Sequence, residues 1–458
     1  MTTQNIDAAL KAATAVPLWL DTDKRPAPRP SLTGADRAAL VVVGGGFTGL
    51  WTALRAKERR PERDVLLLEG GRLGNAASGR NGGFCEASLT HGDHNGMQRW
   101  PEEFKTIERL GRENLAELIG TIRRYGIDCG LEETGTLSVA TQPHQIQGLE
   151  PEHPGFLSQS DVRALVDSPT YLAGRTEAGD GCVLVDPARL VWGLAEAAEG
   201  LGVRIMENTR VTGIRETGPA LRLDTPKGTV RADKVVLATN AFRPLLRRLR
   251  LSTVPVYDYV LATEPLTTDQ LRAIGWSGRQ GISDSGNQFH YYRLTPDNRI
   301  LWGGYDAIYH YGRRIHPDLG DRPATHQLLA RQFYETFPQL ENVKFTHRWG
   351  GVIDTCTRFC AFFGTAKKNK VAYALGYTGL GVGASRFAAD VMLDLLDRDA
   401  TERTALSMVR RRPLPFPPEP FAWIGIQITR RSMAAEDRHG RRNLWLRVLD
   451  RLGLGFDS

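Results

Sequence analysis

The chain has 458 residues, which is long for a single core and sufficient for two intertwined domains. Its composition, 41% hydrophobic and 24% charged, is that of a globular protein, and no apolar run approaches the roughly 18–20 residues that span a bilayer. The net charge is +7, and residues 401–458 contribute most of it, with 11 Arg against six acidic residues. The sequence contains no zinc-finger spacing, RNP-type motif or basic region joined to heptads, so we expect no nucleic-acid partner.

The N-terminal segment and the cysteines indicate the compartment. Residues 1–38 lack a basic region followed by an apolar block, so they predict a proline-rich arm on a domain surface rather than a signal peptide. The cysteines are few, odd in number and scattered, which argues against a disulfide framework. We therefore expect a cytoplasmic protein with five free thiols, at Cys85, Cys129, Cys182, Cys356 and Cys360.

The first predicted unit is a strand–helix–strand at 39–70, "ALVVVGGGFTGLWTALRAKERRPERDVLLLEG". Its apolar run Leu40–Val43 predicts a buried strand, and helical spacing follows as far as Arg60–Pro61. The run Val65–Leu68 predicts a second buried strand, which ends in Glu69. This order of elements is typical of a mononucleotide-binding unit.

A G-x-G-x-x-G fingerprint lies between the first strand and the helix. Gly44 allows the tight turn, Gly46 lets a pyrophosphate approach the backbone, and Gly49 lets the helix pack closely on the strand. The N-terminus of the helix then offers free N–H groups and a positive dipole end to the phosphates. Glu69, 20 residues after Gly49, would accept hydrogen bonds from ribose hydroxyls. The unit alone does not distinguish NAD from FAD.

A second glycine-rich run, "GRLGNAASGRNGGFCE" at 71–86, favours FAD. Together with Gly70 it offers many backbone N–H groups with little steric bulk, and Arg72 and Arg80 add cationic donors. Such a loop can cross a pyrophosphate and continue towards a flat ring system. FAD needs this reach because its isoalloxazine extends well beyond the nucleotide fold.

Later segments complete the pattern. Residues 186–203 predict a helix, and 202–218 and 230–242 predict strands. Residues 371–396 predict a strand, a glycine loop and a helix that begins near Gly381. The N-terminus of that helix can direct its dipole at the flavin, where reduction places negative charge.

Taken together, these motifs resemble the FAD-dependent D-amino-acid oxidase/glycine oxidase superfamily over about residues 17–400. The "ASGRNGG" and "HRWGGVID" stretches are most similar to its gamma-glutamylputrescine oxidase-like branch. The segments that carry the resemblance are the fingerprint at 44–49, Glu69, "ASGRNGG" at 77–83, "VVLATNAF" at 235–242, "YYRLTPDNRILWGG" at 291–304 and "GYTGLGVG" at 376–383.

The resemblance implies an α/β fold, α+β in its second domain, with a discontinuous Rossmann-like FAD-binding domain and a mixed-sheet substrate domain. The FAD-binding domain would comprise 39–98, 182–245 and 350–400. The substrate domain would comprise 99–181 and 246–349, and 401–458 would form an arginine-rich extension.

The resemblance also implies which residues contact the cofactor. They lie in the fingerprint, the second glycine run, two later strands and the late glycine loop: Gly44, Gly46, Phe47, Thr48, Gly49, Glu69, Gly70, Arg72, Ala77, Ser78, Arg80, Asn81, Gly82, Gly83, Val211, Thr239, Asn240, Gly350, Gly379, Leu380, Gly381 and Val382. No metal site is expected. Relatives of the sarcosine oxidase type attach FAD to a cysteine, but Gly351 occupies that register here, so we expect non-covalent FAD. The roles of Cys356 and Cys360 stay open.

The reaction implied by the resemblance is oxidation of an amine or amino acid. Hydride passes from the α-carbon to the flavin, the imine hydrolyses, and oxygen reoxidises the flavin to give peroxide. Arg293 is the candidate for gripping a substrate carboxylate, with a structural ion pair as the alternative. Tyr291 and His290 are candidates for positioning the substrate.

Other polar residues near these segments have two interpretations each. His290 and His347 fit the flavin face, or they are buried histidines with hydrogen-bond partners. Glu86 and Asp93 could hold a cationic amine tail, or they are solvated loop acids.

Three other classes of flavoprotein are compared with the sequence. A disulfide reductase would need a second fingerprint and an early cysteine pair, and this sequence has neither. A dehydrogenase that passes electrons to a quinone at a membrane could use the amphipathic stretch around 444–452 as a surface anchor, although docking onto the FAD domain or a second subunit is the expectation. A non-catalytic flavoprotein subunit is the third.

Overall fold

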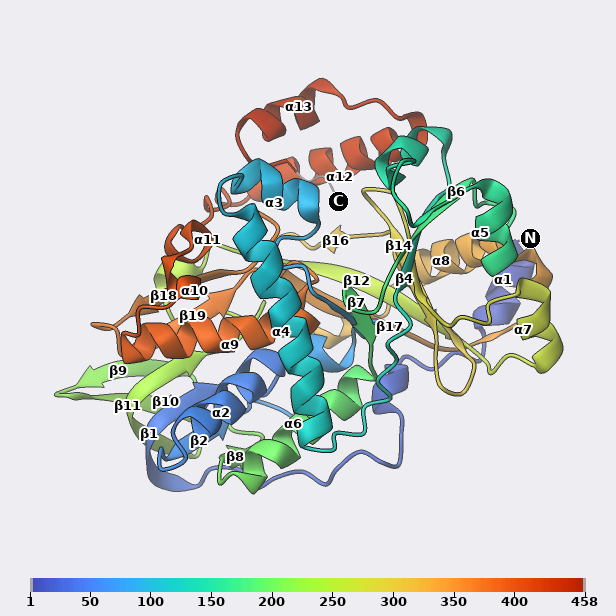
Figure 1. Ribbon diagram of the computed structural model, residues 1–458. Coiled ribbons are helices and arrows are strands. Elements are labelled where there is room, and N and C mark those ends of the chain that lie inside the picture. The colour runs from blue at the N-terminus through green and yellow to red at the C-terminus, as the bar shows by residue number, and fades with distance from the viewer. Residues whose placement is uncertain (1–2, 456–458) are drawn as a thin grey trace.

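The computed structural model describes residues 3–455 and is organised by two sheets (Figure 1). The first sheet carries the predicted nucleotide-binding unit, in the order β18–β19–β11–β1–β2–β8, with β10 beside β11 and β9 beside β10. Its strands are β1 (Gly34–Val43), β2 (Val65–Leu68), β8 (Arg204–Met206), β9 (Gly213–Thr217), β10 (Ala220–Thr225), β11 (Gly228–Leu237), β18 (Phe362–Ala366) and β19 (Val371–Leu375). The parallel register sets Val43 opposite both Leu68 and Leu237, so the carboxyl ends of three strands meet at one edge.

Helices cover one face of this sheet, and a second apolar cluster fills the other, beneath β9 and β10. The covering helices are α2 (Phe47–Arg59), α4 (Phe104–Arg124), α6 (Pro187–Gly200) and α9 (Gly381–Asp397). Sequence explains where α6 begins, because Asp186 accepts hydrogen bonds from the first free N–H groups and Pro187 follows it. The continuous apolar runs of β1 and β2 fit strands that are buried on both faces.

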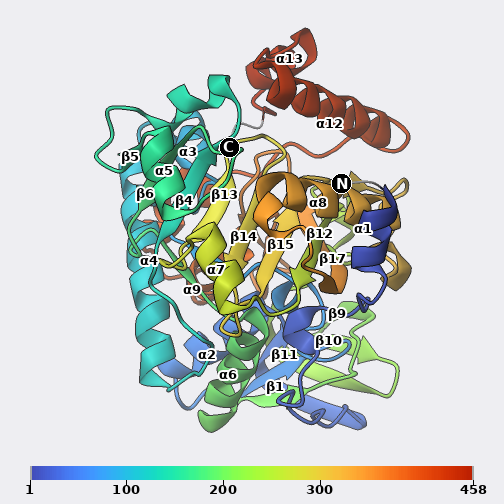
Figure 2. The same cartoon turned by 90° about the vertical axis from the view of Figure 1, so that its right-hand side faces the viewer.

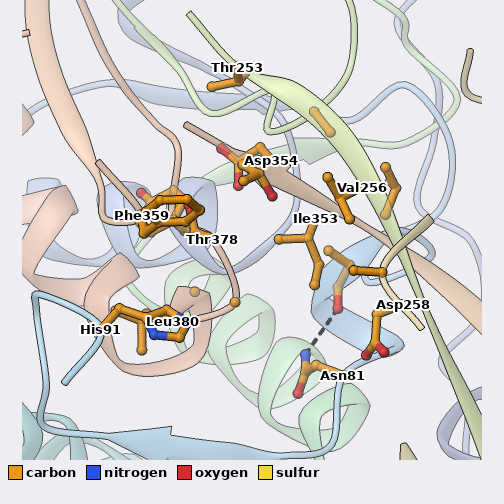
Figure 3. A pocket seen from close by; sticks show the side chains of 18 of the residues that line it. Asn81, His91, Thr253, Val256, Asp258, Ile353, Asp354, Phe359, Thr378 and Leu380 are labelled. Atoms are coloured by element: carbon orange, nitrogen blue, oxygen red, sulfur yellow. Dashed lines mark hydrogen bonds between the residues drawn. The ribbon is translucent and has the colours of Figure 1, made fainter. Parts of the chain in front are cut away.

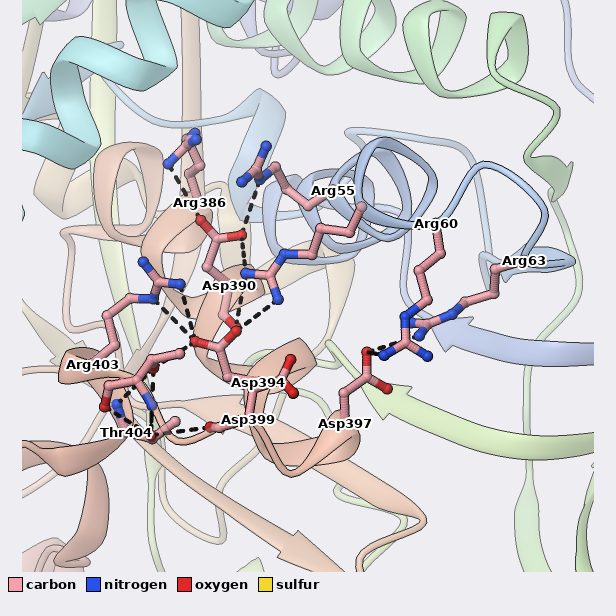
Figure 4. Close-up of polar contacts among 12 residues, drawn as sticks. Arg55, Arg60, Arg63, Arg386, Asp390, Asp394, Asp397, Asp399, Arg403 and Thr404 are labelled. Carbon is pink, nitrogen blue, oxygen red and sulfur yellow. Dashed lines mark hydrogen bonds and ion pairs between the residues drawn. The ribbon is translucent and has the colours of Figure 1, made fainter.

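An ion-pair network joins α2 to α9 (Figure 4). Arg55 and Arg59 lie one turn apart on α2 and both bond Asp390, at 3.0 and 2.7 Å. Arg59 also bonds Asp394 at 2.7 Å, and Arg63 bonds Asp397 at 2.8 Å. Burial acts to raise the pKa of both acids, but the arginines around Asp390 lower its pKa, and Lys234 together with Arg63 lowers the pKa of Asp397. The network therefore fixes the two helices whose N-termini meet the cavity described below.

The second sheet has nine strands in the order β16–β12–β15–β14–β13–β4–β6–β5, with β17 beside β12. Its outer face packs on an aromatic-rich core under α1 (Thr3–Leu10), α5 (Gln159–Leu165), α7 (Thr268–Ile274) and α8 (Pro323–Thr336). The strands are β4 (Thr136–Ala140), β5 (Phe156–Leu157), β6 (Ala173–Glu177), β12 (Val254–Thr263), β13 (Gly281–Asp284), β14 (His290–Leu294), β15 (Ile300–Gly304), β16 (Ile308–Tyr309) and β17 (Phe345–Thr355). A short ribbon of β3 (Phe84–Glu86) and β7 (Cys182–Leu184) adds a third, two-stranded sheet.

The C-terminal extension forms the top of the molecule as drawn in Figure 2. Two short helices, α10 (Glu402–Ala405) and α11 (Ser407–Arg410), lead to α12 (Phe421–His439) and α13 (Leu444–Arg451), and α3 (Asp93–Arg99) lies near the chain end. Among residues 3–455, no helix combines the length and the apolar character needed to cross a membrane.

The elements also show where the predicted boundaries differ from the structure. β1 begins at Gly34, inside the segment predicted to be an arm. α4 lies in the range predicted for the substrate domain, yet its apolar side packs in the core of the first sheet. β17 crosses the boundary predicted at 350 and stays paired with β12 to Thr355. A helix or strand follows its apolar contacts, which a boundary drawn from motifs does not contain.

Candidate active site

A large cavity of about 2330 Å³ is lined by both sheets and by α12 and α13. Figure 3 shows part of its lining. Ordinary ligand pockets measure roughly 300–1,000 Å³. The size therefore fits a long cofactor together with a substrate.

The fingerprint lines one end of this cavity. Gly44 has φ +114°, and a Cβ there would lie 2.3 Å from the Ala238 carbonyl oxygen, so only glycine fits. A Cβ at Gly49 would lie 1.8 Å from the Gly44 oxygen, which explains the close approach of helix and strand. α2 begins after Gly46, with no side-chain cap. These features leave the N-terminus of α2 at the cavity wall with no side chain on its N-cap residue, a position suited to anion binding.

Glu69 is fixed beside the fingerprint. Its Oε2 accepts a hydrogen bond from the Gly45 N–H at 2.6 Å, and its Oε1 accepts one from the Gly71 N–H at 2.7 Å. Burial raises the pKa of this carboxyl group, and the two N–H donors oppose that effect. The carboxyl group lines the cavity at the carboxyl end of β2, where the sequence places a ribose acceptor.

The second glycine run folds over the first. Ser78 Oγ accepts the Phe47 N–H at 3.0 Å, and Asn81 Nδ2 donates to the Ala77 and Ser78 carbonyls. Arg80 donates through Nη1 to the Gly350 oxygen at 3.0 Å, which ties the loop to β17. The loop thus continues from the first sheet to the second.

The late glycine loop forms a further wall. Asp354 accepts the Gly376 N–H at 2.5 Å, and burial raises the pKa of Asp354 to about 7. Gly379 has φ +100°, which brings the chain to the start of α9 at Gly381 without a side-chain cap. The N-terminus of α9 therefore lies at the cavity wall.

These residues fit a dinucleotide cofactor such as FAD. A glycine cradle, a bare helix N-terminus and a fixed carboxyl group line one end, and the side-chain oxygen of Asn240 is buried there with no hydrogen-bond partner in the described chain. Most of the predicted cofactor residues line the cavity: Gly44, Gly46, Phe47, Thr48, Glu69, Gly70, Ala77, Ser78, Arg80, Asn81, Gly82, Val211, Thr239, Asn240, Gly350, Gly379, Leu380, Gly381 and Val382.

Three predicted cofactor residues lie outside the cavity lining. Gly49 serves the packing described above. Arg72 turns away to Glu207, at 3.3 Å, and to the Pro26 carbonyl. A Cβ at Gly83 would lie 2.0 Å from the Val185 oxygen, so this glycine serves the contact between β3 and β7.

The inner face of the second sheet and the end of β3 line another part of the cavity. This part is here called the substrate chamber and is defined by Glu86, Glu177, Asp258 and Tyr291. The Tyr291 hydroxyl donates to Asp258 Oδ2, so the predicted residue Tyr291 does reach the cavity. Burial raises the pKa of Asp258 to about 6. Glu86 is open to the cavity but surrounded by protein, which raises its pKa to about 7, with a further contribution from Glu177.

The expected role of Arg293 does not fit its position. The side chain is 1% exposed and lies outside the cavity lining, and its Nη1 donates to the Val185 carbonyl at 2.8 Å. Glu132 is 3.9 Å away, and burial lowers the pKa of Arg293 to about 10. Strand alternation places Tyr291 and Arg293 on the same face of β14. Tyr291 lines the chamber, whereas the guanidinium of Arg293 lies beneath the glycine loop and reaches the Val185 carbonyl. The alternative, a structural arginine, describes this geometry.

The two histidines also lie outside the cavity lining. His290 Nδ1 is 2.6 Å from Asp284 Oδ2, and Asp284 raises the pKa of this imidazole although burial acts to lower it. His347 Nε2 is 3.1 Å from Asp21 Oδ2, and burial lowers its pKa. Both are histidines with protein partners, the second of the two interpretations from the sequence.

Several lining residues were missed at the sequence level. Asp258 is an acid inside the apolar strand β12, and that contrast was the available signal. The helices α12 and α13 line the cavity with Ile426, Met433, Trp445 and Leu449. The amphipathic pattern at 444–452 predicted docking on the FAD domain or a second subunit. It did not predict a contact with the cavity, because that depends on how a distant part of the chain folds back.

The fold and cavity together define an FAD-binding oxidoreductase, and comparison with known proteins agrees. Residues 39–395 match the DAO family, described as FAD dependent oxidoreductase, and the chain belongs to this family of enzymes. It is 32% identical over 414 residues to the gamma-glutamylputrescine oxidoreductase of Escherichia coli, a match that covers 85% of this chain and 90% of the relative. The crystal structure of glycine oxidase from Geobacillus kaustophilus shares the fold, with a TM-score of 0.66 at 22% identity over 82% of this chain and 99% of that one.

Proposed function

We propose that the protein oxidises the C–N bond of an amine that carries a second cationic group, with oxygen as the electron acceptor and hydrogen peroxide as a product. The observation that carries this proposal is the charge of the substrate chamber. Glu86 and Asp258 line it, and neither forms an ion pair in the described chain.

Three of the arginines that line the cavity already form ion pairs with acids of the chain. Arg175 bonds Glu150 and Glu177, at 2.8 and 2.9 Å, and Arg112 bonds Asp180 at 3.0 Å. Arg430 bonds Asp306 at 2.9 Å. Beside these three arginines a substrate carboxylate would therefore meet guanidinium groups that already have partners, whereas a cation would meet the carboxyl groups of Glu86 and Asp258. This favours an amine over a simple amino acid.

The cofactor and the residues of the chamber have separate roles in the proposed reaction. Bound FAD supplies the redox chemistry at the carbon next to nitrogen. Glu86 and Asp258 hold the cationic groups, and the Tyr291 hydroxyl keeps Asp258 oriented. The name of the Escherichia coli relative contains gamma-glutamylputrescine, a primary amine whose glutamyl end carries a second ammonium group and a carboxylate, which supports an amine with a second cationic group.

We also propose that FAD is held without a covalent bond. Gly351 lines the cavity with no group to form one, and the Cys356 and Cys360 thiols lie outside the lining. Burial raises the pKa of both thiols, which makes them poor nucleophiles. Acid precipitation should release the yellow colour into the supernatant, and colour retained in the pellet would contradict this.

The test of the acceptor is amine-dependent oxygen uptake by the purified chain, with peroxide measured in parallel. Stoichiometric uptake and peroxide support the proposal. Turnover with an artificial acceptor but not with oxygen would favour a dehydrogenase, and no turnover with either would favour a non-catalytic subunit.

A further inference from the structure

The helices α12 and α13 form a hairpin that roofs the cavity (Figure 2). Trp445 Nε1 donates to Thr429 Oγ1 at 2.9 Å, which joins the two helices. Asp437 accepts hydrogen bonds from the backbone N–H groups of Asn287 and Gln288, at 2.7 and 2.9 Å. These bonds connect α12 to the loop between β13 and β14 of the second sheet. Because both helices turn one side to the same cavity, their opposite sides point together away from it.

That outward side is apolar to an extent that folding does not explain. Ile424 and Ile428 lie one turn apart on α12, with 44% and 40% of their surface exposed. Leu444 and Val448 lie one turn apart on α13, with 75% and 39% exposed. Four large aliphatic side chains presented to solvent on adjacent helices indicate a surface that is covered by something else.

The charge around these side chains has one sign. Arg431 and Arg438 continue the exposed face of α12, and Arg447 and Arg451 continue that of α13. None of the four forms an ion pair within residues 3–455.

The acids of the hairpin are engaged elsewhere. Glu436 and Asp450 both form ion pairs with Arg442, at 2.8 and 2.6 Å, and Asp437 accepts a hydrogen bond from the loop between β13 and β14. The outer roof face, defined as Ile424, Ile428, Leu444, Val448 and the four arginines, is therefore apolar and positive.

We propose that the outer roof face docks on a lipid bilayer that contains anionic lipids. A helix that presents aliphatic side chains flanked by arginines binds at the interface, where the aliphatic groups enter the acyl boundary and the guanidinium groups meet phosphates. A second copy of the chain is a poorer occupant. A two-fold contact would set the same unpaired arginines against each other, and like charges repel.

The experiment is cosedimentation of the FAD-loaded protein with phosphatidylcholine vesicles, with and without phosphatidylglycerol. We expect binding to the anionic vesicles that weakens as salt rises. Arg447→Gln with Arg451→Gln should lower the partition coefficient about fivefold per arginine, from roughly 1 kcal/mol for each basic residue at the surface. Leu444→Gln with Val448→Gln should lower it as well.

The matched controls are Arg37→Gln and Leu165→Gln, which change an exposed arginine and an exposed leucine outside the hairpin. They should bind vesicles as the native protein does, and flavin content should confirm that each variant is folded. Failure of the native protein to bind anionic vesicles would overturn the proposal, and so would hairpin variants that bind unchanged. A dimer in light scattering that the Leu444/Val448 variant dissociates would assign the face to a second copy instead.

Discussion

At the residue scale, the selectivity of the substrate chamber depends on the carboxyl groups of Asp258 and Glu86. Their raised pKa values, about 6 and about 7, place both ionisations close to neutral pH. Each is neutral below its pKa and negative above it. The attraction of the chamber for a cation therefore grows as the pH rises through 6 to 7.

We predict that KM for a cationic amine falls with rising pH across this range, until the amine itself loses its proton. Asp258→Asn keeps a partner for the Tyr291 hydroxyl but removes one of the two ionisations. It should cost about 1.5–3 kcal/mol of substrate binding, roughly ten- to hundredfold in kcat/KM. The measurement is the pH profile of kcat/KM beside that of Glu152→Gln, an exposed acid outside the cavity. A profile unchanged by Asp258→Asn would remove this residue from the site.

Gly46→Val tests the cradle of the fingerprint. A Cβ at Gly46 already meets Ser78 Oγ at 2.8 Å, and the remaining methyl groups would occupy the space where a pyrophosphate approaches. We predict loss of FAD binding, measured by flavin absorbance after gel filtration. Gly120→Val is the control, since a Cβ there meets nothing within 4 Å. Full flavin content in Gly46→Val would contradict the cradle.

At the scale of elements, α2 and α9 act as a pair. Each presents an uncapped N-terminus to the cavity, and the arginines of α2 and acids of α9 hold the two helices together (Figure 4). One end of each helix thus serves binding, and their packed sides serve stability.

Gly381→Asp tests the N-terminus of α9. A Cβ at Gly381 meets only the Tyr377 Cβ at 3.9 Å, so the substitution has room and acts through charge. A helix end acts as about half a positive charge, worth ~0.3–1 kcal/mol when exposed and up to ~2 when partly buried. We predict a lower flavin reduction potential in spectroelectrochemical titration, with Gly381→Asn as the matched neutral control. Equal potentials in two fully FAD-loaded variants would mean that α9 does not face the ring.

Asp390→Asn tests the ion-pair network between α2 and α9, here called the clamp. It removes the negative charge that Arg55, Arg59 and Arg386 share and leaves only a neutral amide oxygen as acceptor, and one-sided loss of a buried pair costs about 3–5 kcal/mol. Because Arg55 and Arg59 retain some exposure, we expect the lower end of that range in urea unfolding. Asp399→Asn, an exposed acid just beyond α9, should change little.

The pH dependence of the clamp has a definite sign. The pKa values of Asp390 and Asp397 are lowered in the folded state, so their stabilisation is present above the unfolded value of about 3.9. It should be lost as the pH falls below that value, and Asp390→Asn should remove part of this acid sensitivity. An identical acid-unfolding profile in the variant would contradict the clamp.

At the scale of the whole molecule, the sequence predicted the parts that depend on local pattern. The strand–helix–strand unit, Glu69, both glycine runs and the helix at Gly381 follow from spacing and turn chemistry, and the structure confirms their positions. The exact direction of Arg293 did not follow, because strand alternation fixes a face and not the bend of a long side chain. The roof formed by residues 401–458 did not follow either, because it depends on contacts between segments far apart in the chain.

The most direct test of the account is anaerobic reduction of the bound flavin by a matched pair of substrates. A straight-chain diamine and the ω-amino acid of the same chain length differ only in whether the distal group is a cation or a carboxylate. The charge of the substrate chamber predicts that the diamine bleaches the flavin spectrum and that the amino acid does so far more slowly. Faster bleaching by the amino acid, or none by either compound and by a wider set of amines, would contradict an oxidoreductase that selects cationic amines.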